Sequence, residues 1–431
     1  MASTEERIGK FLRRLLRDRS ALAIAQSLVG EAKPLPPRVP GAGSVSPAAL
    51  DRRWQLLNLP ETVRQELLDP HTAAEAEHYQ NNIENLIGAV RVPVGLAGPL
   101  RTRGMFASGD FYVPLATTEA ALVASYSRGC QVITEAGGCV SILLHEGMRR
   151  TPGFAFHSLR EAGIFAIWCI DQREALSKAA GATTTHGELI DLGIAIEGNH
   201  VYLILEYTTG DASGQNMVTI ATQAICDYIA ANSPIAPEFY CVEANLSGDK
   251  KATAHSFVTV RGKKVSAEIT LPADLIRDRL HSTPQQMERY WRISSLGAIQ
   301  SGSIGIQGHF ANALTALYIA CGQDPACVAE SSVGVTRFEV TASGDLYAAV
   351  TLPSIVVGTV GGGTGLPSQR ACLDILGMAG EGKARALAEL CGALALAGEL
   401  SIAAALASGD FTRAHRKRAR GRESGGGESH G

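Results

Sequence analysis

The chain has 431 residues, of which 45% are hydrophobic, 6% aromatic and 19% charged, so its length predicts two or three domains. Its 39 Lys and Arg residues against 42 Asp and Glu residues give a net charge of −3. This near balance offers no general attraction to nucleic acid or to an anionic membrane. Composition therefore excludes a membrane protein, a collagen and a disordered chain. Nine irregularly spaced cysteines without a CxxC pair are typical of reduced thiols, which favours a cytoplasmic protein.

Residues 1–80 are expected to be helical. Apolar residues at helical spacing predict one amphipathic helix over residues 7–28, followed by a Pro- and Gly-rich linker at 33–43. Residues 46–80 predict two or three short helices, with starts at Ser46 and after Pro60. The first helix is expected to pack on the body of the protein or on a partner subunit. A membrane-surface helix is the less favoured alternative, because acidic residues interrupt its basic face.

Residues 153–246 predict a β-α-β-β-α-β order, the split ferredoxin-like arrangement. The turn between its second and third strands is expected at Gly198-Asn199. The expected elements are a strand at 153–157, a helix around 171–182, strands at 189–196 and 200–207, a helix at 213–231 and a strand at 239–244.

The remaining sequence mixes expected strands with Ala-rich helices. Helices at 311–321 and 386–406 are apolar on most faces, so we expect them to be central or buried at a subunit interface. Residues 413–431 begin with a basic run and end in GGGESHG, which predicts a flexible tail. The expected strands are 256–260, 264–270, 335–340 and 346–350.

Four segments place ionisable residues among small ones. Small neighbours allow a charged side chain to sit in a tight, partly dry site, where pKa shifts are large, although a surface ion pair is the ordinary alternative for each charge alone. The glycine-rich run at 361–365 is not a Rossmann fingerprint, and the sequence has no metal motif, P-loop or GxSxG elbow. The four segments are Glu84-Asn85-Leu86-Ile87-Gly88, Pro114-Leu115-Ala116-Thr117-Thr118-Glu119, Gly248-Asp249-Lys250-Lys251 and Ala320-Cys321-Gly322-Gln323-Asp324.

Together these segments resemble the signature motifs of hydroxymethylglutaryl-coenzyme A (HMG-CoA) reductases, closest to the class I form of the soluble prokaryotic type. The resemblance runs in register from Glu84 to His415, which is most of the chain. It also includes Gly210-Asp211-Ala212-Ser213-Gly214-Gln215-Asn216-Met217, Leu352-Pro353-Ser354-Ile355 and Ala397-Gly398-Glu399-Leu400-Ser401.

This resemblance implies a mixed fold of the α+β or α/β class. A large domain would surround a central helix, with the ferredoxin-like unit inserted as a nucleotide-binding domain. The family's active site forms between subunits, so a homodimer or higher homo-oligomer is implied. The expected parts are a helical part at 1–80, a discontinuous catalytic domain at 81–152 and 247–412, the inserted domain at 153–246 and a basic flap and tail at 413–431.

The resemblance also implies a four-electron reduction of an acyl-CoA thioester to an alcohol with two NADPH, NADH being the alternative. Lys250 would stabilise negative charge on the carbonyl oxygen, and Glu119 would act as a general acid. Asp324 would bond both of them, and His415 would protonate the departing thiolate of coenzyme A. The implied cofactor contacts are Asp211, Ala212, Ser213, Gly214, Asn216 and Arg420. The implied substrate contacts are Glu84, Asn85, Ser125, Arg128, Arg150, Glu243, Asp249, Lys251, His309 and Asn312. No metal is implied.

Two positions depart from the family pattern. Glu243 stands where the family has a serine, and Ile293 aligns with a lysine, although Arg292 is adjacent. Arg150, which would hold the substrate carboxylate, is kept. HMG-CoA reduction to mevalonate is therefore the first interpretation. A different acyl thioester, lacking the free carboxylate or carrying an amine, is the second. An inactive scaffold is the third, and retention of the four catalytic residue types argues against it.

Overall fold

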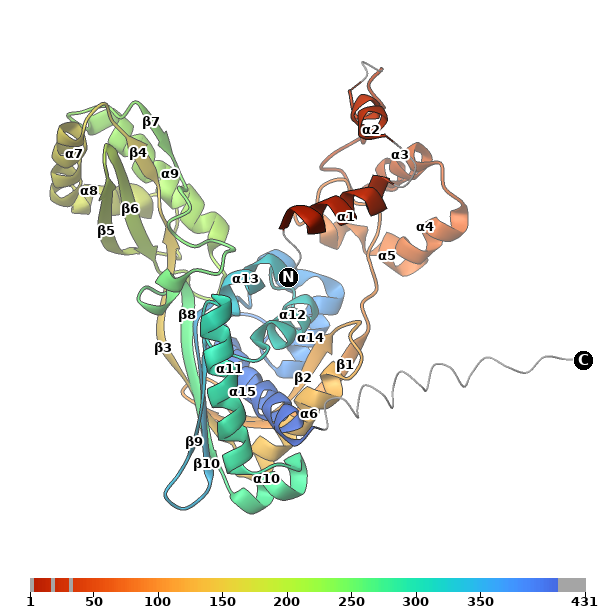
Figure 1. Cartoon of the computed structure of the whole chain (residues 1–431). Coiled ribbons are helices and arrows are strands. Elements are labelled where there is room, and N and C mark those ends of the chain that lie inside the picture. Colours follow the sequence, from red (N-terminus) through yellow and green to blue (C-terminus); the bar gives the residue numbers. More distant parts are fainter. Residues whose placement is uncertain (1–3, 17–19, 31–33, 410–431) are drawn as a thin grey trace, which may run out of the picture.

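The computed structural model describes residues 4–16, 20–30 and 34–409, so His415 and Arg420 lie outside the described residues. Figure 1 shows a helical N-terminal part, a small lobe with its own strands and helices, and a large lobe around a long helix. The fold is mixed α+β with a largely antiparallel sheet, as the sequence predicted.

The N-terminal part contains short helices. The prediction of one helix over residues 7–28 is wrong, because the described residues form two. Ser20 is extended, with φ −72° and ψ 147°, and its side chain accepts the N–H of Ala23, so a new helix begins at Ala21. The short helices expected after Ser46 are confirmed. The elements are α1 (Thr4–Leu16), α2 (Ala21–Ser27), α3 (Pro47–Leu57), α4 (Glu61–Leu67), α5 (Pro70–Ala74) and η1 (Ala76–Tyr79).

Helix α3 anchors a small core of its own. Trp54 is buried with Leu50, Leu68 and Leu86, in a cluster separate from the main core. The buried guanidinium of Arg53 donates to the carbonyl oxygens of the surrounding loops, including Leu86 at 2.8 Å. The buried cation is thereby satisfied without a carboxylate.

Within the described residues, ten strands form one sheet in the order β7-β4-β6-β3-β8-β10-β9, with β1 and β2 attached at β3 and β5 attached at β6. Strand β3 connects the lobes, because it pairs with β8 over most of its length and with β6 at Met148, Arg149 and Arg150 (Figure 1). The strands are β1 (Val94–Gly104), β2 (Ser108–Ala116), β3 (Cys139–Arg150), β4 (Gly153–Ala155), β5 (Leu189–Glu197), β6 (His200–Tyr207), β7 (Phe239–Cys241), β8 (Gly262–Leu271), β9 (Val335–Val340) and β10 (Leu346–Ile355).

The small lobe has the strand order β7-β4-β6-β5 with all neighbours antiparallel. This is the 4-1-3-2 order of the split β-α-β arrangement, and the turn at Gly198-Asn199 joins β5 to β6 as expected. Its helices are α7 (Leu159–Asp171), α8 (Arg173–Gly181) and α9 (Gln215–Asn232). Helix α7 was not predicted, because Ile164, Ile167 and Ile170 are exposed while Phe165 is buried, so apolar residues on both faces obscure its periodicity.

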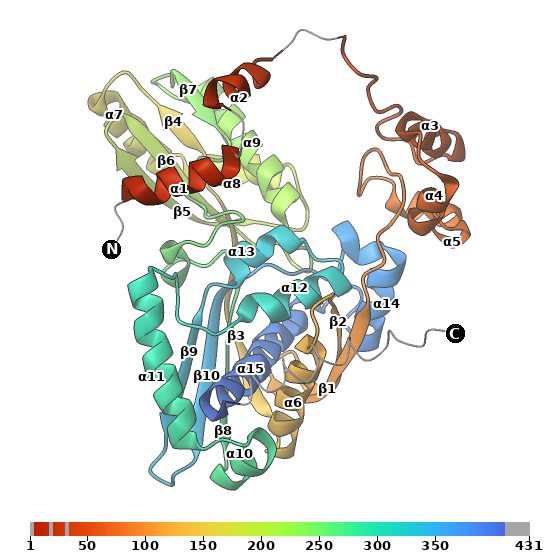
Figure 2. The same cartoon turned by 45° about the vertical axis from the view of Figure 1, so that its right-hand side comes forward.

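The large lobe surrounds α15 (Ala384–Ser408). Figure 2 shows this helix flanked by the strands β8 and β10 and by α6 (Leu122–Glu135), α11 (Pro284–Ser301) and α12 (Phe310–Ala320). Helix α15 is long and apolar enough to cross a membrane by composition. However, 83% of its apolar 18-residue segment is buried inside the protein. The two apolar helices predicted from the sequence are therefore core helices.

Helices α6 and α15 cross closely because each contributes a glycine. A Cβ on Gly129 would lie 1.9 Å from the carbonyl oxygen of Ala397, and one on Gly398 would lie 2.3 Å from Tyr126. A side chain at Gly129 would collide with the backbone of α15, and one at Gly398 would collide with the ring of the buried Tyr126.

The strand predicted at 256–260 is wrong. The structure has η2 (Ala254–Phe257) there, followed by a turn in which Thr259 N–H donates to the carbonyl of His255. Arg149 holds the segment by donating to the carbonyl oxygens of Thr259 and Val260, so a tertiary contact overrides the local strand propensity. The other helical elements are α10 (Ala273–Leu280), η3 (Pro325–Cys327), α13 (Val328–Ser331), η4 (Gly362–Gly365) and α14 (Pro367–Leu376).

Candidate active site

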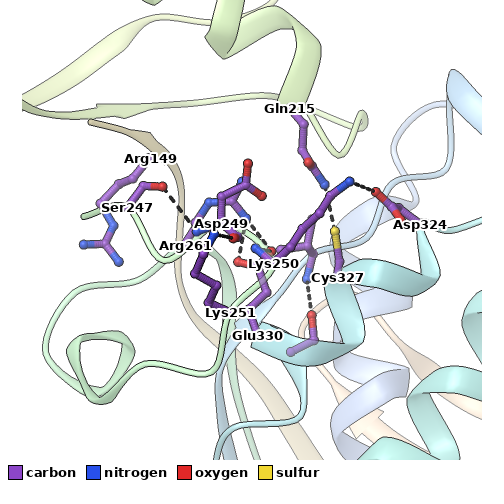
Figure 3. A network of polar contacts seen from close by, with 12 residues as sticks. Arg149, Gln215, Ser247, Asp249, Lys250, Lys251, Arg261, Asp324, Cys327 and Glu330 are labelled. Carbon is purple, nitrogen blue, oxygen red and sulfur yellow. Dashed lines mark hydrogen bonds and ion pairs between the residues drawn. The ribbon is translucent and has the colours of Figure 1, made fainter. Parts of the chain in front are cut away.

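Lys250 and Asp324 form an ion pair where the two lobes meet. Lys250 Nζ lies 2.9 Å from Asp324 Oδ2, although the residues are far apart in the sequence (Figure 3). Lys250 follows β7 in a tight loop and has φ +54°, which is uncommon for a residue with a side chain. Asp324 precedes η3, where its other carboxylate oxygen accepts the N–H of Ala326.

The pair favours the charged form of both groups. The hydrogen bond to Asp324 raises the pKa of Lys250, and burial only partly opposes this. Burial tends to raise the pKa of Asp324, but hydrogen bonds from Lys250 and the Ala326 N–H outweigh it, so the net shift is downward. The site therefore presents a fixed ammonium group, which can stabilise an oxygen that gains negative charge.

A buried ionic network lies beneath this pair. Arg261 is 1% exposed, and its Nη1 lies 2.6 and 2.5 Å from the two oxygens of Glu330, while its Nη2 lies 2.9 Å from Asp249. Glu330 also accepts the main-chain N–H of Lys250 at 3.1 Å. The sequence analysis missed both Arg261 and Glu330. The available signal was a charged residue inside an apolar segment, which must find a partner when buried.

Arg150 lies on the other side of Asp249. Its Nη1 contacts Asp249 Oδ2 at 2.8 Å and Glu243 Oε2 at 3.2 Å. Glu243 Oε2 also accepts the Ser247 hydroxyl at 2.8 Å. The structure thus brings together three residues predicted to bind substrate, and it turns Glu243 toward Arg150. Lys251 is close as well, with its Nζ 3.0 Å from the Asp249 carbonyl oxygen.

A cavity of about 340 Å³ adjoins the Lys250–Asp324 pair. The loop that precedes α9 reaches it through Ser213, opposite Asp324 and the glycine-rich turn. Gly214 precedes α9 with φ +78°, and a Cβ there would lie 2.2 Å from Thr209 Cγ2. A helix start without bulky side chains, facing a cavity, fits the phosphates of a dinucleotide. The cavity is lined by Ser213, Ile319, Gly322, Gln323, Asp324, Pro325, Gly358, Val360, Gly361, Gly362, Gly363, Thr364, Leu366 and Gln369.

Asp211, predicted as a cofactor contact, is engaged with the protein itself. Its carboxylate accepts the N–H groups of Gly382 at 2.7 Å and Ala384 at 3.1 Å, at the start of α15. Burial tends to raise its pKa, but these hydrogen bonds outweigh the effect and lower it. Asp211 therefore ties the cofactor loop to the central helix. Ala212 lies beside it in the same loop, and Asn216 is exposed in the first turn of α9.

A second cluster of predicted residues lies between α6, α12 and α15. Ser125 Oγ lies 2.9 Å from Ser401 Oγ, and Arg128 donates to the Ser401 carbonyl at 2.8 Å. His309 Nδ1 lies 3.1 Å from the Tyr126 hydroxyl, and the Asn312 N–H donates to the His309 carbonyl. Within the described chain these contacts do not join the Lys250 network.

Glu119 does not meet Asp324 as expected. Its side chain is exposed in the loop before α6, its N–H donates to Thr117 Oγ1, and among the described residues no hydrogen bond links its carboxylate to Lys250 or Asp324. The Asp324–Glu119 contact is not formed within the described residues of the single chain, and it stays a prediction for an active site between subunits. Glu84 and Asn85 lie further away in sequence and space, beside the N-terminal helices, where Asn85 N–H donates to Ala42.

The second departure from the expected pattern lies on α11. Ile293 is 66% exposed there, together with Leu296 and Ile299 on the same helix. Arg292, the candidate replacement for the family's lysine, pairs instead with Glu288 one turn earlier at 2.9 Å. Helix α11 thus carries an exposed apolar face, and Arg292 is paired with a carboxylate of its own helix.

Comparison with known proteins gives one consistent family. The model of the hydroxymethylglutaryl-coenzyme A reductase family matches residues 49–420. The 3-hydroxy-3-methylglutaryl-coenzyme A reductase of Methanothermobacter thermautotrophicus is 42% identical over 83% of this chain and 93% of its own length. That of Aeropyrum pernix is 44% identical over 88% of this chain and 91% of its own length. The class II reductase of Streptococcus pneumoniae bound to NADPH has the same fold, with a TM-score of 0.63, 19% identity and coverage of 83% of this chain and 96% of that chain.

Proposed function

Because the chain belongs to the hydroxymethylglutaryl-coenzyme A reductase family, we propose that it reduces HMG-CoA to mevalonate with two NADPH. The observation that carries this proposal is the Lys250–Asp324 pair at the edge of the cavity that Ser213 reaches. It places a cation for the thioester oxygen beside a helix start suited to a dinucleotide.

The reaction converts one thioester, two NADPH and two protons into an alcohol, free coenzyme A and two NADP⁺. Bound NADPH supplies the electrons to the carbonyl carbon. Lys250 holds its ammonium group against the carbonyl oxygen as that oxygen gains negative charge, and Asp324 keeps the ammonium protonated and oriented. By the family resemblance, Glu119 supplies a proton to the developing alcohol, and His415 protonates the thiolate of coenzyme A.

The site is proposed to be completed by a second copy in a homodimer or larger homo-oligomer. Two observations support this. Glu119 is exposed and apart from Asp324 within one chain, and α11 exposes the apolar side chains Ile293, Leu296 and Ile299. Large exposed apolar patches mark interaction surfaces.

We further propose a class I-like enzyme of the cytoplasm, with NADPH favoured over NADH. Identities of 42% and 44% to archaeal reductases, against 19% to a class II enzyme, support the class. The proposed domains are 1–80, 81–152 with 247–412, 153–246, and a flap and tail at 413–431. The separate core around Trp54 and the 4-1-3-2 strand order of the small lobe support these divisions.

The decisive experiment follows NADPH oxidation by absorbance with purified protein and HMG-CoA, with NADH in parallel. We expect turnover with NADPH and a loss of about 100-fold or more in Lys250→Ala, since removing one oxyanion donor costs about that much. Glu339→Ala, in an exposed ion pair on β9, is the matched control and should retain activity. NADPH binding without any HMG-CoA turnover would contradict the proposal.

A second candidate function is reduction of an acyl thioester that lacks a free carboxylate. The observation that favours it is the position of Glu243. Its carboxylate and that of Asp249 both contact Arg150 Nη1. Glu243 Oε1 is buried without a hydrogen-bond partner among the described residues. An acceptor left unpaired favours an acyl group that carries a hydrogen-bond donor or an amine, and it disfavours a second anion.

The two candidates are separated by comparing kcat/KM for HMG-CoA and for 3-hydroxy-3-methylbutyryl-CoA, which lacks the carboxylate. If the second candidate holds, the wild-type chain prefers the latter, and Glu243→Ser combined with Ile293→Lys raises kcat/KM for HMG-CoA by about tenfold or more. Glu238→Ser, in an exposed pair with His157, is the control. A wild-type preference for HMG-CoA with no gain in the double variant would reject the second candidate.

A further inference from the structure

The first residue of α9, Gln215, touches both halves of the site. Its side-chain Nε2 lies 2.8 Å from Cys327 Sγ, across the junction between the lobes (Figure 3). Its main-chain carbonyl oxygen faces Arg150 Nη2 at 3.4 Å. Gln215 thus links the Arg150 cluster with the residues next to Asp324.

Cys327 extends this contact to the reacting centre. It ends η3, three residues after Asp324, and it is fully buried. Burial, with the nearby carboxylates of Glu330 and Asp324, raises the pKa of its thiol to about 12, so the S–H is retained at neutral pH. Its main-chain N–H donates to the Asp324 carbonyl oxygen at 3.0 Å, and the Asp324 carboxylate in turn holds Lys250. The thiol accepts the Gln215 amide and the main chain of the same residue contacts Asp324, so Cys327 joins the two contacts.

The position of Gln215 connects these contacts to the cofactor loop. Ser213, which lines the cavity, and Gly214 immediately precede it. A dinucleotide that orders this loop also fixes the first turn of α9, and so the Gln215 side chain. The position of Gln215 then biases Cys327, Asp324 and Lys250 on the substrate side.

We propose that Gln215 is a positioning residue that couples cofactor binding to the Lys250–Asp324 pair through Cys327. This inference rests on the proposed function, and it assigns to Gln215 a role distinct from contact with either ligand. The coupling is reciprocal, because a ligand held by Lys250 must strengthen cofactor binding by the same factor.

The test measures that factor directly. Isothermal titration gives the Kd of NADP⁺ for the purified chain, alone and with saturating HMG-CoA, a combination that cannot turn over. We expect HMG-CoA to tighten NADP⁺ binding about fivefold or more in the wild type, the usual lower range for coupled sites. In Gln215→Met, which keeps the length of the side chain and removes the amide, the ratio should fall to about one.

Three further variants make the test specific. Cys327→Ala should abolish the coupling like Gln215→Met, the double variant should be no worse than either, and Cys327→Ser, which keeps a donor and an acceptor, should retain most of it. Gln223→Met makes the same substitution two turns later on α9, where the exposed Gln223 donates to Asp227, and it should behave as wild type.

The failures are distinguishable. A wild-type chain that binds NADP⁺ but not HMG-CoA contradicts the proposed function, and the inference falls with it. Binding of both ligands with a ratio of one, an unchanged ratio in Gln215→Met, or multiplicative effects of the two single variants would overturn the coupling alone.

Discussion

Glu330 accepts the main-chain N–H of Lys250 at 3.1 Å, so a buried carboxylate from the large lobe fixes the backbone of the residue whose ammonium faces the cavity. The contact explains how Lys250 keeps its left-handed conformation, which costs free energy unless neighbouring groups hold it. Arg261 in turn neutralises Glu330, because its Nη1 contacts both carboxylate oxygens of Glu330. The position of the reactive ammonium thus depends on a buried charge pair beneath it.

Removing Glu330 should damage both stability and activity. Glu330→Ala leaves the buried Arg261 unpaired on that side, and we expect a loss of about 3 kcal/mol in the free energy of unfolding and a lower kcat. Glu330→Gln keeps an acceptor for the Lys250 N–H, so its kcat should lie between those of the Ala variant and the wild type. Urea denaturation and steady-state kinetics measure the two effects.

As a control, Glu339→Ala removes an exposed ion pair and should change stability by less than about 0.5 kcal/mol. Equal stabilities for the two Ala variants would contradict the prediction.

The Lys250–Asp324 pair predicts a pH dependence. Lys250 has a pKa raised above its usual 10.5 by Asp324, so its contribution is present below pH 10.5 and is lost as pH rises through the folded pKa. Asp324 has a pKa below its usual 3.8, so its contribution is present above pH 3.8 and is lost as pH falls through the folded pKa. Both side chains are more than a third exposed, at 44% and 39%, so the effect should appear in activity more than in stability.

Asp324→Asn removes the largest cause of the raised pKa of Lys250 and leaves burial, which lowers it. We therefore expect the basic limb of the kcat/KM profile to move to lower pH in this variant. The residual rate of the variant is measured from pH 6 to 10 beside the wild type. Asp374→Asn, in an exposed pair with Arg370, is the control and should leave the profile unchanged. A basic limb that stays in place in Asp324→Asn would mean that Asp324 does not set the protonation of Lys250.

The parts of the fold that the sequence predicted are those governed by local pattern. The hairpin of β5 and β6 follows from alternation around Gly198, and α15 follows from an apolar run of helical length. The segment at 256–260 is rich in β-branched and aromatic residues, but Arg149 draws its carbonyl groups into a turn. That interaction joins residues about a hundred positions apart, which no local pattern contains.

The candidate site divides in the same way. Lys250 and Asp324 were expected from the motifs around them, and their contact is confirmed. Arg261, Glu330 and Gln215 were not identified, because each acts through a partner distant in sequence. The role of a buried charge can be inferred only when its counter-charge is known, and the counter-charge is identified only in the three-dimensional structure.

Glu389 predicts a large effect on stability from a residue outside the site. It lies on α15 without exposure, and its carboxylate accepts the N–H groups of Phe106 and Ala107 at 2.8 Å and of Leu143 at 3.1 Å. Glu389→Ala would leave these donors without an acceptor, each costing about 1 kcal/mol or more. We expect a loss of about 3 kcal/mol in urea denaturation. Glu389→Gln keeps one acceptor oxygen and should be less damaging. An Ala variant as stable as the Gln variant would show that water replaces the carboxylate.

Asp211 gives a final prediction, because the structure assigns it to α15 and the resemblance assigns it to the cofactor. Its carboxylate accepts the N–H groups of Gly382 and Ala384, in the manner of a helix cap supplied from the other lobe. Asp211→Ala should lower the free energy of unfolding by about 1 kcal/mol, the usual cost of a lost cap. Its pKa is lowered on folding, so the contribution is present above pH 3.8 and is lost as pH falls through the folded pKa.

The difference in stability between wild type and Asp211→Ala should therefore be constant at neutral pH and shrink under acid conditions. Urea denaturation at pH 7 and at pH 3 measures it, and isothermal titration with NADPH separates the second role. If Asp211 acts only by capping α15, Asp211→Asn, which keeps one acceptor oxygen, restores both stability and NADPH affinity together. If it also contacts the dinucleotide, Asp211→Asn recovers stability while NADPH affinity stays reduced. Unchanged stability in Asp211→Ala would refute the capping role, since the variant removes the carboxylate that accepts these two N–H groups.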